Sequence, residues 1–533
     1  MQKKNGIAIP DDVTLSWQEL LEYARELSLA EKVALRKVDS RHFGLGEERR
    51  RIEAAYAAAR GGKHAGAELP PLAEWFYDNR FLFIEQIRQL MLERRVYRLP
   101  HMLGGRFANM PRCLMLATVL LRHSAYRISA EQIQEFLEAF QQETGLDSGE
   151  LWAFVDMLKV ALLRAVSTLA RQCVSILSLW RAAERFCERA GREGAQIDAL
   201  LTEYKSYLTS AVFIEHAIVL LRENPKAAEI TERISARLSV RDLTVERLVK
   251  QAHALQAKSI LYISNAISSL RTLAKLNFEP LFESVSLVHK YLTADEDYAN
   301  MDYDSREYYR KGITAIAQAL QASEPAVARA AADMAKRSGV HVGEYIVGGR
   351  RRELMEALGR VPARTRLADW VRRHMLLIYV GGTVVSTVVS AALLSIPLFP
   401  MHPPVYGIIG FFISLIPIYT VAVTINNRMM TFFQKPAFIP KLALKQGLTE
   451  DMATMVVIPA LVTSEEDGAE LVQKMEVYWA ANQQSNLYFT LLSDFKEDKN
   501  EIAAYDEDLI QKVDAMVAAL NAKYGREIFF YVQ

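Results

Sequence analysis

Two long stretches without a charged residue constrain the fold of this sequence most strongly. Residues 376–399 and 405–427 contain no Asp, Glu, Lys or Arg. Each reaches the roughly 20 mostly apolar residues that a helix needs to cross the hydrocarbon core of a bilayer. Only residues 400–404 connect them, so we predict a two-helix transmembrane hairpin within residues 361–427. The alternative, two buried helices of a soluble protein, fits less well because such stretches rarely occur next to each other in soluble domains.

Positive charges on both sides of the hairpin predict its orientation. The connecting turn contains no Lys or Arg. Basic residues stand before the first stretch and after the second: Arg364, Arg366, Arg372, Arg373, Arg428, Lys435, Lys441 and Lys445. Cytoplasmic flanks of membrane helices are enriched in Lys and Arg, so we expect both termini in the cytoplasm. The first residues show no apolar segment typical of a signal peptide, which agrees with this orientation.

Residues 1–360 are predicted to form an all-helical cytoplasmic region. Apolar residues recur three and four positions apart from about residue 16 to 359, without the alternation of strands. Ser28 with Glu31 and Ser129 with Gln132 have the spacing of capping boxes, and Asp147 precedes a helix expected to open at Glu150. No fixed repeat period is visible, which favours irregular helical domains over a solenoid.

The cysteine pattern and the net charge limit other interpretations. Cys113, Cys173 and Cys187 lack the paired spacing of disulfides or zinc ligands and are predicted to be buried thiols in a reducing compartment. The 64 Lys and Arg residues nearly balance the 63 Asp and Glu residues, so charge gives no reason to expect a nucleic-acid partner.

Residues 428–453 follow the hairpin and alternate aromatic and Met residues with lysines. Pro436 and Pro440 interrupt any long helix. This pattern favours a short amphipathic segment at the membrane surface, with a plain linker as the alternative.

The last stretch, residues 454–533, has the pattern β-α-β-α-β. Strands are expected at 454–462, 486–493 and 527–532, and helices from a capping box at Thr463 and Glu466 to about 481 and at 506–524. This is the opening of a doubly wound α/β fold. The sequence stops at Gln533 with only three strands, so we expect a truncated domain.

Ligands of such sheets bind beyond the carboxyl ends of the strands, which points to Thr463, Ser464 and Asp494. A carboxylate at Asp494 can accept hydrogen bonds from a nucleobase or ribose, although an Asp after a strand can also simply form a turn. Thr463 can act as a helix cap alone, and backbone amides at that helix start could face a diphosphate. We assign no catalytic residue.

Other motifs are better explained by structure than by chemistry. The sequence contains three Asp-x-Asp triplets: Asp295 with Asp297, Asp302 with Asp304, and Asp506 with Asp508. They lie in helical sequence or at a helix start, where capping explains them, so no metal ligand is assigned. Two aromatic groups are attributed to packing rather than to sugar binding: Trp75, Phe76, Tyr77, Phe81 and Phe83, and Tyr303, Tyr308 and Tyr309.

Several long segments are similar to a known family. Residues 70–89, 149–164, 265–292, 298–310 and 341–358 resemble the N-terminal half of the cyclic β-1,2-glucan synthase family of bacterial membrane glycosyltransferases. Residues 455–495 resemble the start of the glucosyltransferase domain of that family.

The resemblance implies a multi-pass enzyme of the bacterial inner membrane that makes cyclic β-1,2-glucan from UDP-glucose. Its partners would be UDP-glucose, the growing glucan and membrane lipid, and its cofactor a divalent metal, Mg or Mn. Residues 454–533 would begin a GT-A-like nucleotide-sugar-binding domain, in which Asp494 matches the acidic residue that contacts uridine.

The family's metal-binding and catalytic motifs are missing from these 533 residues, so we expect no glucose transfer by this chain alone. A non-catalytic, membrane-tethered helical scaffold is the alternative. For the helical region, handling of the acceptor, control of chain length and support of the catalytic domain all stay open.

Overall fold

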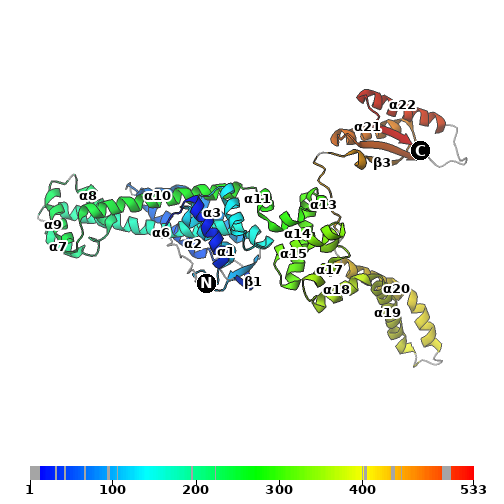
Figure 1. Cartoon of the computed structure of the whole chain (residues 1–533), viewed down its shortest axis with the longest axis horizontal. Coiled ribbons are helices and arrows are strands. Elements are labelled where there is room, and N and C mark those ends of the chain that lie inside the picture. The colour runs from blue at the N-terminus through cyan, green and yellow to red at the C-terminus, as the bar shows by residue number, and fades with distance from the viewer. Residues whose placement is uncertain are drawn as a thin grey trace. The chain divides into compact units, whose positions relative to one another are not determined.

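The computed structural model describes residues 13–533 except 31–32, 41–43, 65, 67, 93–96, 105, 194–195, 223, 399, 401–404, 434–437, 446 and 495–505 (Figure 1). The chain divides into two compact units. The first comprises Met1–Asp295 and Tyr309–Lys435, and the second comprises Glu296–Tyr308 and Pro436–Gln533. The structure is mainly helical, at 73% helix, and has a small parallel sheet near the C-terminus, as predicted.

The first unit contains most of the helices. Its first half comprises α1 (Trp17–Ala30), α2 (Gly46–His64), α3 (Pro71–Leu92), α4 (Arg112–His123), α5 (Ala130–Phe140), α6 (Ser148–Gly191), α7 (Ile197–Glu203), α8 (Ala211–Leu221), α9 (Ala227–Ser239) and α10 (Val245–Lys275). Further along the chain follow α11 (Phe278–Val285), α12 (Leu287–Leu292), α13 (Glu296–Ala299), α14 (Tyr303–Leu320), α15 (Glu324–Ser338), α16 (Gly343–Ile346), α17 (Arg351–Leu358) and α18 (Ala363–Arg373). Of these, α13 and the start of α14 belong to the second unit.

Helix α6 is 44 residues long and is the central element of the first unit. Helices α2, α4, α8 and α10 pack along it. The buried face of α6 contributes Leu151, Phe154, Met157 and Leu158 to the main apolar core, where Phe76 of α3 is also fully buried. Apolar residues spaced three and four apart therefore produce the packing predicted from the sequence.

The prediction of an all-helical region was wrong at one place. Strands β1 (Val33–Ser40) and β2 (Tyr97–Met102) form an antiparallel pair in which Val38 lies opposite Leu99. The buried residues Leu99 and Met102 are three positions apart, a helical spacing, so periodicity could not reveal the strand. The predicted capping box at Ser28 was also wrong, because Ser28 lies in the last turn of α1 and donates a hydrogen bond to the Arg25 carbonyl. Its proposed partner Glu31 lies outside the described residues.

The other helix starts agree with the sequence. Ser129 and Gln132 form a reciprocal capping box at the start of α5. Asp147 and Glu150 form the same arrangement at α6, which begins at Ser148, two residues before the predicted start. Cys113, Cys173 and Cys187 are all buried free thiols, and burial raises the pKa of Cys173 and of Cys187 to about 12.

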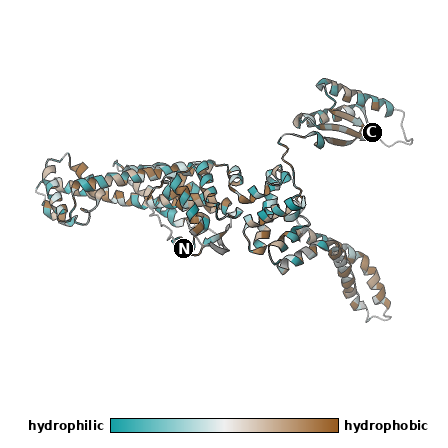
Figure 2. Cartoon of the chain, viewed as in Figure 1, coloured by the Kyte–Doolittle hydropathy of each residue, from teal (hydrophilic) through white to brown (hydrophobic). Residues whose placement is uncertain are grey.

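Helices α19 (Met375–Ser395) and α20 (Val405–Phe433) form the predicted hairpin and are long and apolar enough to cross a membrane. Figure 2 shows both as predominantly hydrophobic. In the most apolar 18-residue stretch of each helix, only 17% (α19) and 6% (α20) is buried within the protein. This is expected for helices whose surfaces face another apolar medium. Helix α20 continues to Phe433, six residues beyond the predicted end, and Asn426 donates a 2.8 Å hydrogen bond to Thr383 of α19. The turn residues 401–404 lie outside the described residues.

The second unit contains the sheet β3 (Thr454–Leu461), β4 (Leu487–Asp494) and β5 (Phe529–Val532), together with helices α21 (Glu465–Ala481) and α22 (Asp506–Tyr524). The strands are parallel in the order β3-β4-β5. Val472 and Met475 of α21 and Val513 and Val517 of α22 share one apolar core with Phe489 of β4. Both helices therefore cover the same face of the sheet, as β-α-β units in sequential order require.

Part of the predicted membrane-surface segment has a defined partner in this unit. The Ala443 amide donates a 2.8 Å hydrogen bond to the Asn300 carbonyl, and the Lys441 amide donates a 2.7 Å bond to the Ser305 hydroxyl. Met301 and Leu442 form an antiparallel bridge. Residues 441–443 are thus extended rather than helical.

Candidate functional site

The parallel register of β3 and β4 brings the predicted site residues to one edge of the sheet. Leu461 lies opposite Asp494, and the Val462 amide donates a 3.1 Å hydrogen bond to the Asp494 carbonyl. Thr463 and Ser464 follow directly after β3, so the loop that carries them emerges beside the end of β4. Thr463 and Asp494 are exposed, as a ligand contact would require.

The helix cap after β3 lies one residue later than predicted. Ser464, not Thr463, is the N-cap of α21, and its hydroxyl accepts a 3.2 Å hydrogen bond from the Asp467 amide. The Thr463 hydroxyl instead donates to the Asp467 carboxylate. The hydrogen bonds from Thr463 and Ser464 lower the pKa of Asp467, so this carboxylate is ionised at neutral pH.

The first turn of α21 is strongly acidic. Glu465, Glu466 and Asp467 follow one another there. Negative charge is favourable at a helix N-terminus, but three carboxylates oppose the binding of a further anion at the same place. The arrangement therefore disfavours the idea that the amides of this turn hold a diphosphate.

The sheet edge has a rigid base on the side of the helices. Ser493, immediately before Asp494, is buried, and its hydroxyl lies 2.8 Å from the Tyr531 hydroxyl of β5. Gly468 of α21 lies so close to α22 that a Cβ atom at this position would be 2.7 Å from Cγ2 of Val513. A glycine is needed here because it allows the two helices to approach closely.

Sequence reasoning missed an ion pair at this edge. Lys512 of α22 lies 3.0 Å from a carboxylate oxygen of Glu465 and 2.9 Å from one of Asp508. The first turns of α21 and α22 therefore lie side by side at the carboxyl edge of the sheet. The spacing of Asp508 and Lys512, four positions on one helix, was the only available signal, and it does not indicate the partner on α21.

The three Asp-x-Asp triplets occupy different places. Asp295 accepts hydrogen bonds from His341 Nδ1 at 2.9 Å and from the Val342 amide at 2.7 Å. Asp302 accepts a 2.8 Å bond from the Ser305 amide at the start of α14 and thus caps that helix. Asp506 and Asp508 begin α22, at the same sheet edge as Asp494.

The residues present do not assemble a metal site at this edge. In the part of residues 454–533 that the structure describes, no three His, Cys, Asp or Glu ligand atoms come within 4.8 Å of one another. A divalent metal requires such a convergent set of oxygen ligands. We therefore derive no chemical step through a metal from these residues.

The aromatic groups are mainly packing elements. Phe76 and Phe83 are fully buried and have ring centroids 5.8 Å apart, whereas Phe81 is exposed. Tyr309 is buried, and Tyr308 packs against Phe438. Neither group forms an exposed platform of several rings.

No protein-family model matches the chain. The chain is 28% identical over 508 residues to the cyclic beta-(1,2)-glucan synthase NdvB of Rhizobium meliloti (strain 1021), a match that covers 91% of this chain. The chain spans only 18% of the length of that relative. Because so little of this chain is left unmatched, the match includes the hairpin and part of the α/β region. The similarity to the cyclic β-1,2-glucan synthase family, expected from the sequence segments, is thereby confirmed.

Proposed function

We propose that this chain is part of a membrane-bound glucosyltransferase that makes cyclic β-1,2-glucan from UDP-glucose. The similarity to a cyclic β-1,2-glucan synthase along 91% of the chain is the observation that carries the proposal. The apolar hairpin α19–α20 supports a place in a membrane, and the parallel β-α-β-α-β order of residues 454–533 supports a nucleotide-sugar-binding role. Nucleotides bind such sheets at the carboxyl edge, where Asp494 lies.

The edge is suited to the nucleoside part of the donor. The Asp494 carboxylate can accept hydrogen bonds from the ribose hydroxyls or from the uracil N–H group. The Ser464 hydroxyl accepts a bond from the Asp467 amide and donates to the Asp467 carboxylate, so its hydrogen is already used within the loop. Thr463 already donates to Asp467, so it can offer only an acceptor lone pair.

The diphosphate requires positive charge that this edge does not offer. The three acidic residues of the first turn of α21 would repel a diphosphate, and Lys512 is paired with two carboxylates. We therefore propose that this region holds the uridine moiety and that a divalent metal, Mg or Mn, neutralises the departing diphosphate on ligands from outside the described residues. When bound, the metal would stabilise the charge that develops on the leaving group.

Titration calorimetry of UDP against the full 533-residue chain in detergent tests the proposal. Asp494→Asn keeps the shape of the side chain and removes its charge, so we expect UDP affinity to fall roughly tenfold, as for loss of a charge-assisted hydrogen bond. Asp514→Asn, an exposed carboxylate in the middle of α22, is the matched control and should leave affinity unchanged. Equal affinity of UDP for the Asp494→Asn variant and the parent would remove the assignment of Asp494. No UDP binding by the parent would favour the scaffold alternative.

A further inference from the structure

Helix α18 (Ala363–Arg373) lies directly before the first of the two apolar helices (Figure 1). Only His374 separates it from α19, which contains 21 residues. A helix needs about 20 residues to cross the hydrocarbon core of a bilayer. A membrane-spanning α19 therefore uses nearly its whole length to cross, and α18 begins where the core ends. The backbone of His374 is not helical, with φ −107° and ψ 20°, so the chain changes direction between the two helices.

One face of α18 is apolar and exposed. Leu367, Trp370 and Val371 are spaced three and four positions apart and therefore share one side of the helix. Leu367 is 62% exposed and Trp370 is 54% exposed. The neighbouring helix α17 differs, because its apolar residues Leu354 and Met355 are buried. Within the described chain, the apolar face of α18 is therefore largely uncovered.

Positive charge borders this face. Residues 360–374 contain five arginines and a single acidic residue, so the segment cannot neutralise its own charge. Arg366 and Arg373 are exposed and lie four positions before and three positions after Trp370, on the same side of the helix. Arg366 donates hydrogen bonds of 3.2 and 3.1 Å to the Val361 carbonyl, and neither arginine forms an ion pair with a described carboxylate. Trp370 thus stands between an apolar stripe and a basic flank.

We infer that α18 lies along an anionic lipid surface. In this arrangement Leu367 and Trp370 enter the boundary between headgroups and acyl chains, and Arg366 and Arg373 bind lipid phosphates. Helices of the membrane interface combine an apolar face that carries Trp and Leu with a polar face rich in Lys and Arg. Guanidinium groups also match the geometry of phosphate oxygens.

The direct connection to α19 identifies the bilayer as the occupant of this face. The inference rests on the proposed place of α19 and α20 in the membrane. A one-residue link then holds α18 at the level of the headgroups, where Trp and Arg are favourable. A soluble protein fits this face less well, because it would have to displace the headgroup layer beside α18.

Quenching of tryptophan fluorescence by spin-labelled lipid tests the inference on the full chain in phosphatidylglycerol vesicles. Trp370 is one of six tryptophans, so comparison with Trp370→Phe isolates its contribution. A spin label near the headgroup should quench this contribution strongly, and a label at the end of the acyl chain only weakly, because interfacial helices lie about 5–10 Å deep. The matched control is Trp479→Phe, which removes a tryptophan that packs against Tyr524 in the α/β region. This control should leave the quenched component unchanged, and an equal loss of that component in both variants would contradict the inference.

The basic flank is tested with Arg366→Gln and Arg373→Gln combined. In phosphatidylglycerol vesicles, headgroup-label quenching of Trp370 should fall to the level that the parent shows in neutral phosphatidylcholine vesicles. High salt should have the same effect on the parent, because it screens exposed charges. Arg192→Gln combined with Arg241→Gln is the matched control, because both arginines are exposed elsewhere in the first unit, and it should retain the quenching of the parent.

A reporter in the hairpin separates the failure of this inference from that of the proposed membrane location. Tyr419 is exposed near the middle of α20, so Tyr419→Trp in the Trp370→Phe protein should be quenched most by the label at the end of the acyl chain. Absence of that quenching would remove the hairpin from the bilayer and overturn both proposals. Quenching of Tyr419→Trp without a Trp370 component would overturn the inference alone. Equal quenching of Trp370 in neutral and anionic vesicles would do the same.

Discussion

Replacement of Arg112 by Met should lower the stability of the first unit more than substitution of an exposed residue does. The Arg112 side chain is 7% exposed, and that of its partner Glu150 is fully buried. Nε of Arg112 donates a 2.8 Å hydrogen bond to Glu150, and Nη2 donates to the other Glu150 oxygen and, at 3.2 Å, to the Gly145 carbonyl. The charge of Glu150 raises the pKa of Arg112 despite its burial, so the pair is ionic.

The neighbours of Glu150 set the expected magnitude. Loss of one partner of a buried ion pair typically costs about 3–5 kcal/mol. Glu150 would keep the hydrogen bond from the Asp147 amide at 3.1 Å and the favourable field of the N-terminus of α6. We therefore expect a loss near the lower limit, about 3 kcal/mol. Adding Glu150→Gln to the Arg112→Met variant removes the unpaired buried charge and should recover part of the lost stability, because Gln can still serve as the capping-box acceptor.

Thermal unfolding of the full chain, followed by circular dichroism at 222 nm, measures the effect. Arg112→Met should lower the midpoint by several degrees, and the double variant should lower it less. Arg192→Met is the control, because Arg192 and Glu188 form an exposed pair with side chains 67% and 68% accessible. Exposed pairs contribute about 0–1 kcal/mol. An equal loss of stability in Arg112→Met and Arg192→Met would refute the reasoning.

Three further predictions concern other parts of the chain. Burial lowers the pKa of His216 from 6.5 to about 4, so the unfolded state takes up its proton first as pH falls. Stability should decrease by up to about 3 kcal/mol from pH 6.5 to 4, and His216→Phe should reduce this pH dependence in melting curves. Gly468→Ala should cost the α/β region about 1–3 kcal/mol through overpacking, measured by limited proteolysis, and a second change, Val513→Ala, should relieve it. Single cysteines at Met401 and Thr449 should react with an impermeant thiol reagent only at 401 in intact cells; labelling at 449 but not at 401 would contradict the proposed topology.

The sequence predicted elements that depend on one local pattern. Uncharged length specified α19 and α20, and alternating strand and helix signals located β3, α21, β4 and α22 to within a few residues. Leu461 and Asp494 lie opposite each other at the carboxyl ends of paired parallel strands, and this pairing followed from the fold class alone. Such signals are sufficient because each element satisfies its own backbone hydrogen bonds or those of a sequential neighbour.

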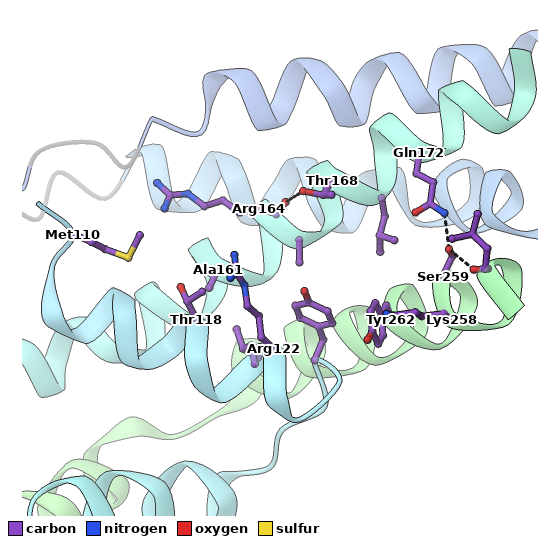
Figure 3. A pocket seen from close by; sticks show the side chains of 15 residues that line it. Met110, Thr118, Arg122, Ala161, Arg164, Thr168, Gln172, Lys258, Ser259 and Tyr262 are labelled. Atoms are coloured by element: carbon purple, nitrogen blue, oxygen red, sulfur yellow. Dashed lines mark hydrogen bonds between the residues drawn. The ribbon is translucent and has the colours of Figure 1, made fainter. Parts of the chain in front are cut away.

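Features that depend on distant partners could not be predicted in this way. Strand β1 pairs with β2 some sixty residues later in the chain, and the apolar residues of β2 have helical spacing. Lys512 reaches Glu465 on another helix, and Arg122, Arg164 and Lys258 line one cavity although they come from α4, α6 and α10 (Figure 3). A single sequence gives no signal for such contacts between distant residues, because each residue by itself has the character of an ordinary surface charge.

The buried ion pair of Arg112 and Glu150 and the proposed uridine site lie in different units of the chain. Glu150 is in the first turn of α6 in the first unit, and Asp494 ends β4 in the second unit. The apolar core around α6 and the apolar core of the α/β region share no described residue. Substitutions at Arg112 should therefore act on stability and substitutions at Asp494 on UDP affinity, with effects that add when the two are combined. A variant at Arg112 that altered UDP affinity below its melting temperature would show that the two units are energetically coupled.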